Sequence, residues 1–315
     1  MGKLLIISAL AAGLSLPTTV FADPWTYVGG SGQTVELEAA PKRIIASQDA
    51  AAGLIPLGIR PVGIYVDSPV EDAKALEGLD LSGIEIIGRA WGEVDVEKAA
   101  LLEPDLVIAE WWPLNSTWSG GQDVSRALAS LAPVTGPTQG SSILTLIEDY
   151  EALAMSLGAD LSAEHVAADK AQFERSVAAF KDAVAAKPDL SVLAVWPGTD
   201  ALYVAVPASA AELMDFESWG LDVLQPEFAD RLASWETLSW ERADKYQPDL
   251  ILVDNRSRDT LQTAEAQPTW TMIKAAAAGA VTDWPAFWLR NYAAYSRELD
   301  KLTSAVQAAD EHLAD

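Results

Sequence analysis

The residues of this chain that are best suited to binding a ligand are its tryptophans, because of where they fall. The sequence has 12 Trp, more than its 7 Tyr or its 6 Phe. In a parallel α/β sheet, ligands bind beyond the carboxyl ends of the strands. Five tryptophans stand at or just beyond such a predicted end, and a sixth, Trp235, stands in a loop just before a predicted helix; the five are Trp91, Trp111, Trp112, Trp196 and Trp288. This placement predicts a Trp-lined cleft, and the alternative is that these rings are scattered core residues.

Arginines occupy similar positions, although the chain has only 21 basic residues. Arg89, Arg256 and Arg290 each follow a predicted strand or a Trp that lies beyond one. A planar guanidinium can fork onto the oxygens of a carboxylate, a hydroxamate or a catecholate. We therefore expect these arginines to contact the ligand, with Arg89 as the strongest candidate. The alternative for each is a surface salt bridge with one of the 46 acidic residues.

The sequence offers no catalytic or metal-binding constellation. Its two histidines, His165 and His312, lie in polar helical stretches with no Cys or His at ligand spacing, so we expect solvated imidazoles. It contains neither a P-loop nor a GxSxG nucleophile motif, and no pair of its many carboxylates stands out. This favours a binding protein over an enzyme. A secreted hydrolase that uses the same cleft and an adhesion module are the alternatives from other classes.

Short apolar strands alternate with helices along most of the chain. This alternation is typical of α/β lobes with central, mainly parallel, Rossmann-like sheets. We expect an N-terminal lobe over residues 41–160 and a C-terminal lobe over 189–315. The predicted strands fall into two groups, at 41–46, 61–66, 84–87 and 106–109, and at 191–196, 202–206 and 250–253.

One long helix is predicted between the two groups of strands. Residues 162–187 contain no Gly or Pro, and Pro188 stops the run. Apolar residues recur on one face of it: Val166, Phe173, Val177, Phe180 and Val184. A helix of ~26 residues is ~39 Å long, which is enough to cross from one lobe to the other. We therefore assign 161–188 as a bridging helix; the alternative is a surface helix that covers one sheet.

One phrase occurs twice in the chain. VDVEKAALLEPDLVI at 94–108 and LSWERADKYQPDLIL at 238–252 align without a gap. Each copy is typical of a short helix, a Pro stop and a buried strand. The repeat indicates two like lobes, and it places Glu97 and Glu241 at equivalent positions, one on each. The alternative role for both is to complement the helix dipole in a first turn, which is worth ~0.3–1 kcal/mol.

The first residues of the chain indicate secretion, and its net charge argues against two classes of partner. A basic start, an apolar stretch and a small-residue cleavage site follow one another in residues 1–22, so we expect a signal peptide cleaved after Ala22 and a periplasmic protein. Residues 23–40 carry little pattern and are expected to form an irregular lead-in, with at most one strand, near Thr34–Leu37. The net charge of −25 argues against nucleic acid and anionic membrane surfaces as partners.

Four stretches of the chain resemble one family. Together with the long helix they resemble the periplasmic binding proteins for ferric siderophores, cobalamin and haem, which serve ATP-driven importers. The likeness is closest to the hydroxamate-siderophore branch. It implies two α/β lobes joined by one long helix, with a shallow ligand cleft between them. The stretches are PKRIIASQDAAAGLIPLGIRPVGI at 41–64, GRAWGEVDVEKAALLEPDLVI at 88–108, LSWERADKYQPDLILV at 238–253 and WTMIKAAAAGAVTDW at 270–284.

For function, the resemblance implies a monomeric binding component that captures a ferric siderophore and delivers it to an ABC permease in the inner membrane. The iron would arrive chelated by the ligand, so no cofactor is implied. Glu97 and Glu241 would meet arginines of the permease, and Arg89 would grip the siderophore. The chain departs from the family in its excess of Trp, which leaves cobalamin and haem as alternative ligands. Aromatic contacts would come from Trp91, Trp111, Trp112, Trp235 and Trp288.

Overall fold

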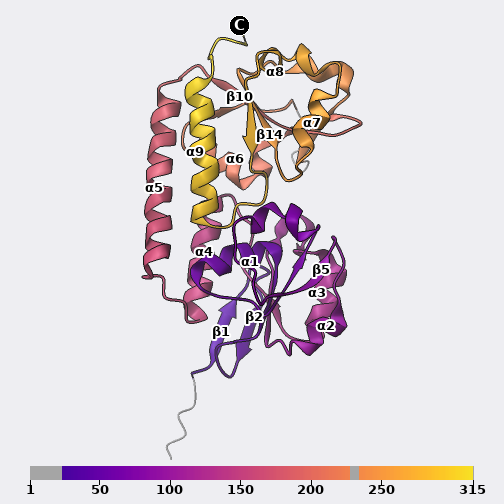
Figure 1. Cartoon of the computed structure of the whole chain (residues 1–315), viewed down its shortest axis with the longest axis vertical. Coiled ribbons are helices and arrows are strands. Elements are labelled where there is room, and N and C mark those ends of the chain that lie inside the picture. Colours follow the sequence, from indigo (N-terminus) through magenta and orange to yellow (C-terminus); the bar gives the residue numbers. More distant parts are fainter. Residues whose placement is uncertain (1–22, 228–233, 315) are drawn as a thin grey trace, which may run out of the picture.

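The computed structural model describes residues 23–227 and 234–314. The chain forms two α/β lobes, one above the other in Figure 1, as the sequence predicts. Two long helices, α5 (Glu164–Ala185) and α9 (Tyr292–Ala308), run along one side of the molecule. Within the described part of the chain, every helix is too short or too polar to cross a membrane.

The first lobe is built on a five-stranded sheet in which every pair of neighbours is parallel. The strand order is β5-β4-β3-β6-β9. The buried strand β3 runs directly into α1 (Gln48–Leu54), because the side chain of Ser47 caps the helix by accepting a hydrogen bond from Ala50 N. The other elements are β3 (Ile44–Ser47), β4 (Gly63–Val66), β5 (Glu85–Arg89), β6 (Leu106–Ile108), β9 (Val134–Thr135), α2 (Val96–Leu101), α3 (Gly121–Ala129) and α4 (Ile143–Ser156).

The second lobe has a mixed sheet in the order β13-β11-β10-β14-β15, with β12 also paired to β10. β14 and β15 are parallel to β10, whereas β11 and β13 add an antiparallel edge. The sheet is therefore less parallel than that of the first lobe. The elements are β10 (Ser191–Pro197), β11 (Leu202–Ala205), β12 (Asp222–Val223), β13 (Trp235–Leu238), β14 (Leu250–Asp254), β15 (Val281–Trp284), α6 (Ala211–Ser218), α7 (Thr260–Glu265) and α8 (Lys274–Ala277).

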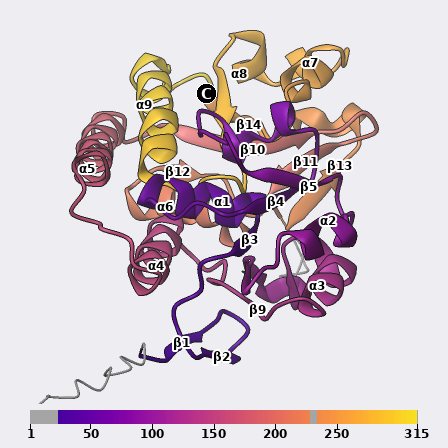
Figure 2. The same ribbon diagram turned by 60° about the horizontal axis from the view of Figure 1, so that its bottom comes forward.

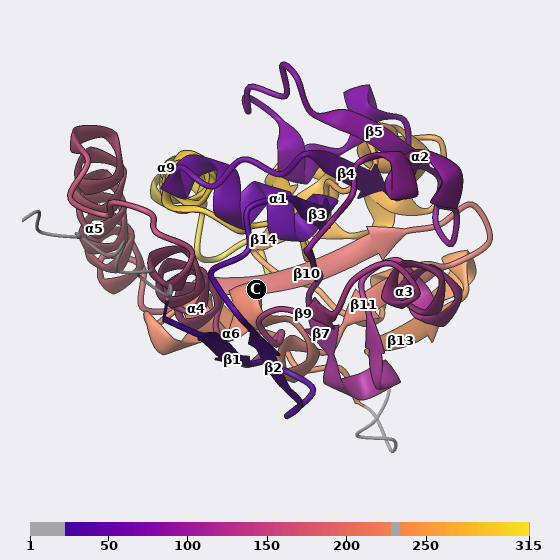
Figure 3. The ribbon, with the colours of Figure 1, turned by 90° about the horizontal axis from the view of Figure 1, so that it is seen from below.

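Two short hairpins stand outside these sheets. The first, β1 (Trp25–Val28) with β2 (Thr34–Leu37), occupies most of the lead-in that was expected to be irregular. The indole of Trp25 donates to Ser156 Oγ at 3.1 Å, which holds the hairpin beside α4 (Figure 3). The second hairpin, β7 (Trp111–Trp112) with β8 (Thr117–Trp118), follows β6.

The long helix is three residues shorter at each end than the bridging helix assigned to 161–188. α5 has 22 residues, and its start is set by a turn in which Ser162 Oγ donates to Asp160 Oδ1. At one end His165 Nε2 lies 3.1 Å from Pro56 O of the first lobe, and at the other Lys187 Nζ donates to Ala309 O after α9. Figure 2 shows α5 and α9 together, on the side of the molecule opposite α2 and α3. α5 therefore reaches elements of both lobes.

The two lobes share one hydrophobic core. A single cluster of buried side chains contains Ile44 and Leu106 from the first sheet and Val192 and Leu250 from the second. Along α5, the ring of Phe173 packs 5.4 Å from that of Tyr292 and 5.0 Å from that of Tyr295, measured between centroids. Because packed cores resist deformation, this continuity opposes large movements of one lobe against the other.

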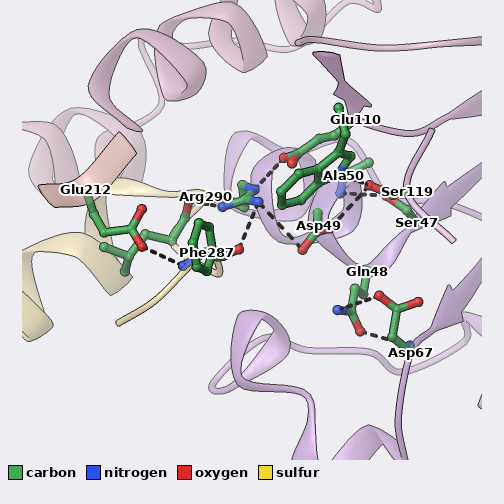
Figure 4. Close-up of polar contacts among 12 residues, drawn as sticks. Ser47, Gln48, Asp49, Ala50, Asp67, Glu110, Ser119, Glu212, Phe287 and Arg290 are labelled. Carbon is green, nitrogen blue, oxygen red and sulfur yellow. Dashed lines mark hydrogen bonds and ion pairs between the residues drawn. The ribbon is translucent and has the colours of Figure 1, made fainter. Parts of the chain in front are cut away.

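A buried ion pair also joins the lobes. The Arg290 guanidinium, from the loop before α9, donates through Nε to Glu110 Oε1 at the end of β6, and both side chains are 0% exposed. Its Nη2 lies 4.0 Å from Asp49 Oδ1 on α1, and Tyr150 OH donates to Glu110 Oε1 at 2.8 Å. Figure 4 shows Arg290 pointing between these carboxylates. Arg290 was predicted to contact a ligand, but the structure places it inside the protein, where its charge is enclosed and compensated.

A second buried carboxylate holds the turn before Arg290. Phe287 has a φ of 64°, in the left-handed region that is unfavourable for a bulky residue. Its N–H donates to Glu212 Oε1 at 2.6 Å, and its carbonyl accepts from Arg290 Nη2 at 3.0 Å (Figure 4). Burial raises the pKa of Glu212 to about 7, and Glu212 Oε2 has no hydrogen-bond partner among the described residues.

Removing the inter-lobe cation should destabilise the protein strongly. We expect Arg290→Met to lower the free energy of unfolding by about 3–5 kcal/mol, because Glu110 would remain buried without its partner. Denaturant unfolding measures this. The matched control is Arg126→Met, which breaks an ion pair with Asp123 whose two side chains are 75% and 89% exposed. Its effect should stay below ~1 kcal/mol; equal effects of the two changes would contradict a structural role for Arg290.

Glu212 should make stability depend on pH. Its raised pKa means that the folded state binds the extra proton between its ordinary pKa and about 7, so stability falls as the pH rises through that range. Glu212→Gln keeps an oxygen for Phe287 N without the charge. We expect its gain in unfolding free energy over the wild type to grow from below ~1 kcal/mol at pH 5 to roughly 3 kcal/mol at pH 8. Denaturant unfolding at both pH values tests this, and a gain that is independent of pH would refute it.

Candidate ligand-binding site

The carboxyl ends of strands from both sheets face one cavity of about 420 Å³. In the first lobe its lining residues follow β3, β4, β5 and β6, and in the second they follow β14 and β15. A second hollow of about 360 Å³ adjoins it and shares the residues Trp112, Asn115, Arg256 and Phe287. Both volumes lie in the range of small-molecule sites, ~300–1,000 Å³. The two hollows, called here the inter-lobe cavity, are where the lobes can hold a ligand.

Aromatic rings line the inter-lobe cavity from both sides. Trp91 and Trp112 come from the first lobe, and Phe287 and Trp288 come from the second. Trp112 Nε1 donates to Ser119 Oγ at 3.2 Å, and Trp288 Nε1 donates to Asn255 Oδ1 at 2.7 Å, so these rings are held in place. Trp91 is 62% exposed, and so much indole surface in water is typical of a residue that a ligand or partner covers.

The other three predicted tryptophans lie differently. Trp235 lines the adjoining hollow. Trp196 stacks on Tyr203 at 4.7 Å and lies 6.0 Å from Trp235, but it lines neither hollow. Trp111 packs edge-on against Trp118 across the β7–β8 hairpin at 5.0 Å, and it supports the hairpin rather than the cavity wall. The structure thus brings Trp91, Trp112, Trp235 and Trp288 together at the cavity.

Of the three predicted arginines, Arg256 is the one that lines the cavity. Its Nε and Nη2 bind the two oxygens of Asp254, which is 1% exposed, and its guanidinium lies 5.0 Å from the Phe287 ring centroid. Within residues 23–227 and 234–314, Nη1 has no hydrogen-bond acceptor, so it is available to a ligand. Arg89 is exposed and lines a separate, open hollow with Glu93, Asp95 and Lys98.

Carboxylates also line the cavity, and sequence reasoning did not select them. Asp49 follows β3 and Asp67 follows β4, and Asp72 lies further along the same wall. Burial raises the pKa of Asp49 to about 7, partly opposed by Arg290, and burial raises the pKa of Asp67 to about 6. Applying the strand-end rule to acidic residues as well as to Trp and Arg would have found Asp49 and Asp67.

The two repeated glutamates lie on the surface of their respective lobes. Glu97 is exposed in the first turn of α2, which Asp95 caps by accepting a hydrogen bond from Lys98 N at 3.0 Å. Glu241 is exposed in the first turn of a 3-10 helix, Trp240–Lys245, so the second copy of the repeat differs from the first in helix type. Hydrogen bonds with its own backbone N–H and with Ser239 lower the pKa of Glu241. Both carboxylates are exposed and open to a partner.

In the part of the chain that the structure describes, no group of three or more His, Cys, Asp or Glu side chains is arranged to hold a metal ion. The polar groups of the inter-lobe cavity are suited to contacts with the outside of a ligand: forked donors, carboxylate acceptors and aromatic faces.

Comparisons with known proteins agree with this architecture. The family model described as periplasmic binding protein matches residues 68–286. The ferric-siderophore receptor protein DesE from Streptomyces coelicolor is 30% identical, with a TM-score of 0.83, over 91% of this chain and 99% of that one. No curated protein matches the sequence.

More distant structures share the fold alone. FhuD2 from Staphylococcus aureus with bound ferrioxamine B is 20% identical, with a TM-score of 0.61, over 87% of this chain and 100% of that one. FhuD from Vibrio cholerae, bound to Fe³⁺-Desferal, is 20% identical, with a TM-score of 0.60, over 85% of this chain and 98% of that one. Because the family model matches more than half of the chain and a relative is 30% identical over 91% of it, the chain belongs to the periplasmic binding protein family.

Proposed function

We propose that this protein is the solute-binding component of an ABC importer, and that it captures a ferric siderophore of the hydroxamate type in the inter-lobe cavity. The observation that carries the proposal is the cavity itself, where Trp112, Trp288 and Arg256 converge from facing strand ends. The likeness to DesE, a ferric-siderophore receptor protein, supports this ligand class. The bound ligand is then delivered to a permease in the inner membrane.

The chemistry of the cavity suits a pre-chelated metal. A siderophore's own oxygens fill the coordination sphere of ferric iron, so the protein has to bind only the outside of the complex. Indole faces cover the apolar linkers of such a ligand, and the free Nη1 of Arg256 can donate to its oxygens. The iron is cargo, and the protein needs no cofactor and acts as a binder rather than an enzyme.

Capture should proceed with little movement of the lobes. The shared core, α5 and the Arg290–Glu110 ion pair all connect the two lobes. Hinged receptors close by large changes at a few loop residues, and this chain has little freedom of that kind. The cavity is therefore largely formed before the ligand arrives, and its affinity comes from surfaces that are already in position.

The remaining assignments are part of the same proposal. The protein acts as a monomer in the periplasm after loss of residues 1–22, which lie outside the described residues. Residues 41–160 form one lobe and 189–315 the other, with 161–188 between them. Glu97 and Glu241 dock onto permease arginines, since each is exposed near the start of a helix on its own lobe.

A fluorescence titration tests the ligand class. The Trp side chains that line the cavity should be quenched by at least one ferric hydroxamate complex at micromolar concentration or below, because the chelate would stack against them. Cobalamin and haem are titrated alongside. If only one of those two binds, the siderophore assignment is wrong while the family assignment stands.

Two matched variants then locate the contact. We expect Arg256→Gln to weaken binding by roughly 1.5–3 kcal/mol, about the worth of a hydrogen bond to a charged group. The new amide can still reach Asp254. Arg89→Gln removes the same charge outside the cavity and should leave the affinity unchanged. The opposite result would make Arg89 the gripping arginine.

Docking is tested by uptake into cells that carry the cognate permease. Glu97→Ala combined with Glu241→Ala should abolish transport, while ligand affinity and the melting temperature remain near those of the wild type. The control is Glu164→Ala with Glu174→Ala, which removes two exposed carboxylates from α5. Normal transport by the first double variant would leave both glutamates with only a helix-dipole role.

A further inference from the structure

The wall of the inter-lobe cavity that comes from the first lobe is acidic. Asp49, Asp67 and Asp72 line it, and their only cationic neighbours on the lining are Lys74 and Arg256. Both cations already have anionic partners: Lys74 Nζ lies 3.3 Å from Glu77 Oε2, and Arg256 forks onto Asp254. The lining of the cavity therefore carries an excess of negative charge.

Asp67 is the carboxylate of this wall that is held ready for a ligand. Its Oδ2 accepts from Gln48 Nε2 at 3.3 Å, and its N–H donates to Gln48 Oε1 at 3.1 Å, so two contacts with one side chain fix it (Figure 4). Within the described residues, its Oδ1 has no hydrogen-bond partner. Asp67 also lies half-buried at the carboxyl end of β4, where a ligand in the cavity would meet it.

The two neighbouring carboxylates already have partners in the protein. Asp49 accepts from Ser119 Oγ at 3.3 Å and lies 4.0 Å from Arg290 Nη2, so part of its charge is compensated by the inter-lobe cation. Asp72 lies 3.6 Å from Arg258 Nε at the rim, and both of these side chains are more than half exposed. Asp67 is thus the one of the three carboxylates that has no cation within ion-pair distance among the described residues.

The charge of the wall discriminates between classes of ferric complex. Three hydroxamate anions neutralise Fe³⁺, so the core of such a complex is uncharged, and a pendant ammonium makes the whole ligand a cation. Three catecholates instead leave a complex with three negative charges. A carboxylate in a partly dry cavity attracts the hydroxamate complex that carries an ammonium and repels the triply negative catecholate complex. The long-range field of a chain with a net charge of −25 acts in the same direction.

We propose, on the basis of the siderophore function argued above, that Asp67 pairs with a cationic amine carried by the ligand, so that the cavity selects positively charged hydroxamate complexes over neutral and anionic ones. Asp49 lies behind this contact and adds to the attraction. Burial raises the pKa of Asp67 to about 6, which indicates an anion that lacks compensation when no ligand is present. A ligand ammonium would supply that compensation.

The test uses two ligands that differ in one charge. Ferrioxamine B carries a terminal ammonium, and acetylating that amine gives a neutral complex with the same hydroxamate core. We expect the wild type at pH 7.5 to bind the cationic complex at least about tenfold more tightly, by Trp fluorescence. Asp67→Asn should bring the ratio close to one, mainly by weakening the binding of the cationic complex. Asp123→Asn removes one negative charge from an exposed position on α3, outside the cavity, and should keep the wild-type ratio.

Each outcome decides one question. Equal affinities in the wild type, or a ratio that Asp67→Asn does not change, would overturn the role of Asp67 while the siderophore function stands. Binding of neither complex would instead overturn the siderophore function. If Asp67→Asn lowers the melting temperature, the same ratio is measured in the wild type at pH 5. There protonation of Asp67 and Asp49, whose pKa values burial raises to about 6 and about 7, should reduce the ratio, while the ligand amine keeps its charge. An unchanged ratio at pH 5 would refute the proposal.

Discussion

The Arg290 guanidinium, enclosed between Glu110 and Asp49, is the contact on which the arrangement of the two lobes depends. Burying these charges costs several kcal/mol each, and the attraction between them recovers this only when the geometry is correct. A buried ion pair contributes little more to the stability of the fold than well-packed apolar side chains would. It is, however, favourable in few relative positions of the two lobes. Here it allows one relation between the end of β6 and the loop before α9. The shared core along α5 maintains the same relation.

The binding surface follows from that constraint. With the lobes fixed, the carboxyl ends of β3, β4 and β6 always face those of β14 and β15, and the cavity between them keeps its shape. Two residues belong both to the contacts around Arg290 that join the lobes and to the cavity lining. Asp49 lies 4.0 Å from Arg290 Nη2 and lines the cavity. The carbonyl of Phe287 accepts a hydrogen bond from Arg290, and its ring lies beside the guanidinium of Arg256. A change in the contacts around Arg290 would therefore alter ligand affinity, and ligand binding would in turn affect those contacts.

Local pattern predicted much of this and failed where distant residues decide. The alternation of strands and helices, the stretch at 162–187 and the Trp residues at strand ends were all visible from spacing. Arg256 and Arg290 look alike in sequence, since each stands just beyond a strand or its Trp, yet one lines the cavity and the other is buried. Their difference is set by Glu110, which lies 180 residues from Arg290. Asp67 did not stand out among 46 acidic residues. Of the β1–β2 hairpin, a strand near Thr34–Leu37 was expected, whereas its partner Trp25–Val28 was assigned to the irregular lead-in.

The same separation along the chain has a consequence for how the protein matures. Lobes usually fold in the order in which they are synthesised. Here the whole first lobe is synthesised long before Arg290, the cation that pairs with its buried carboxylates. Until Arg290 has been added to the chain, Glu110 and Asp49 have no cation to pair with and have to stay hydrated, so the surface around them cannot be buried. The first lobe therefore reaches its final packing only when the chain is almost finished. A fragment that ends before Arg290 would leave Glu110 and Asp49 in contact with water.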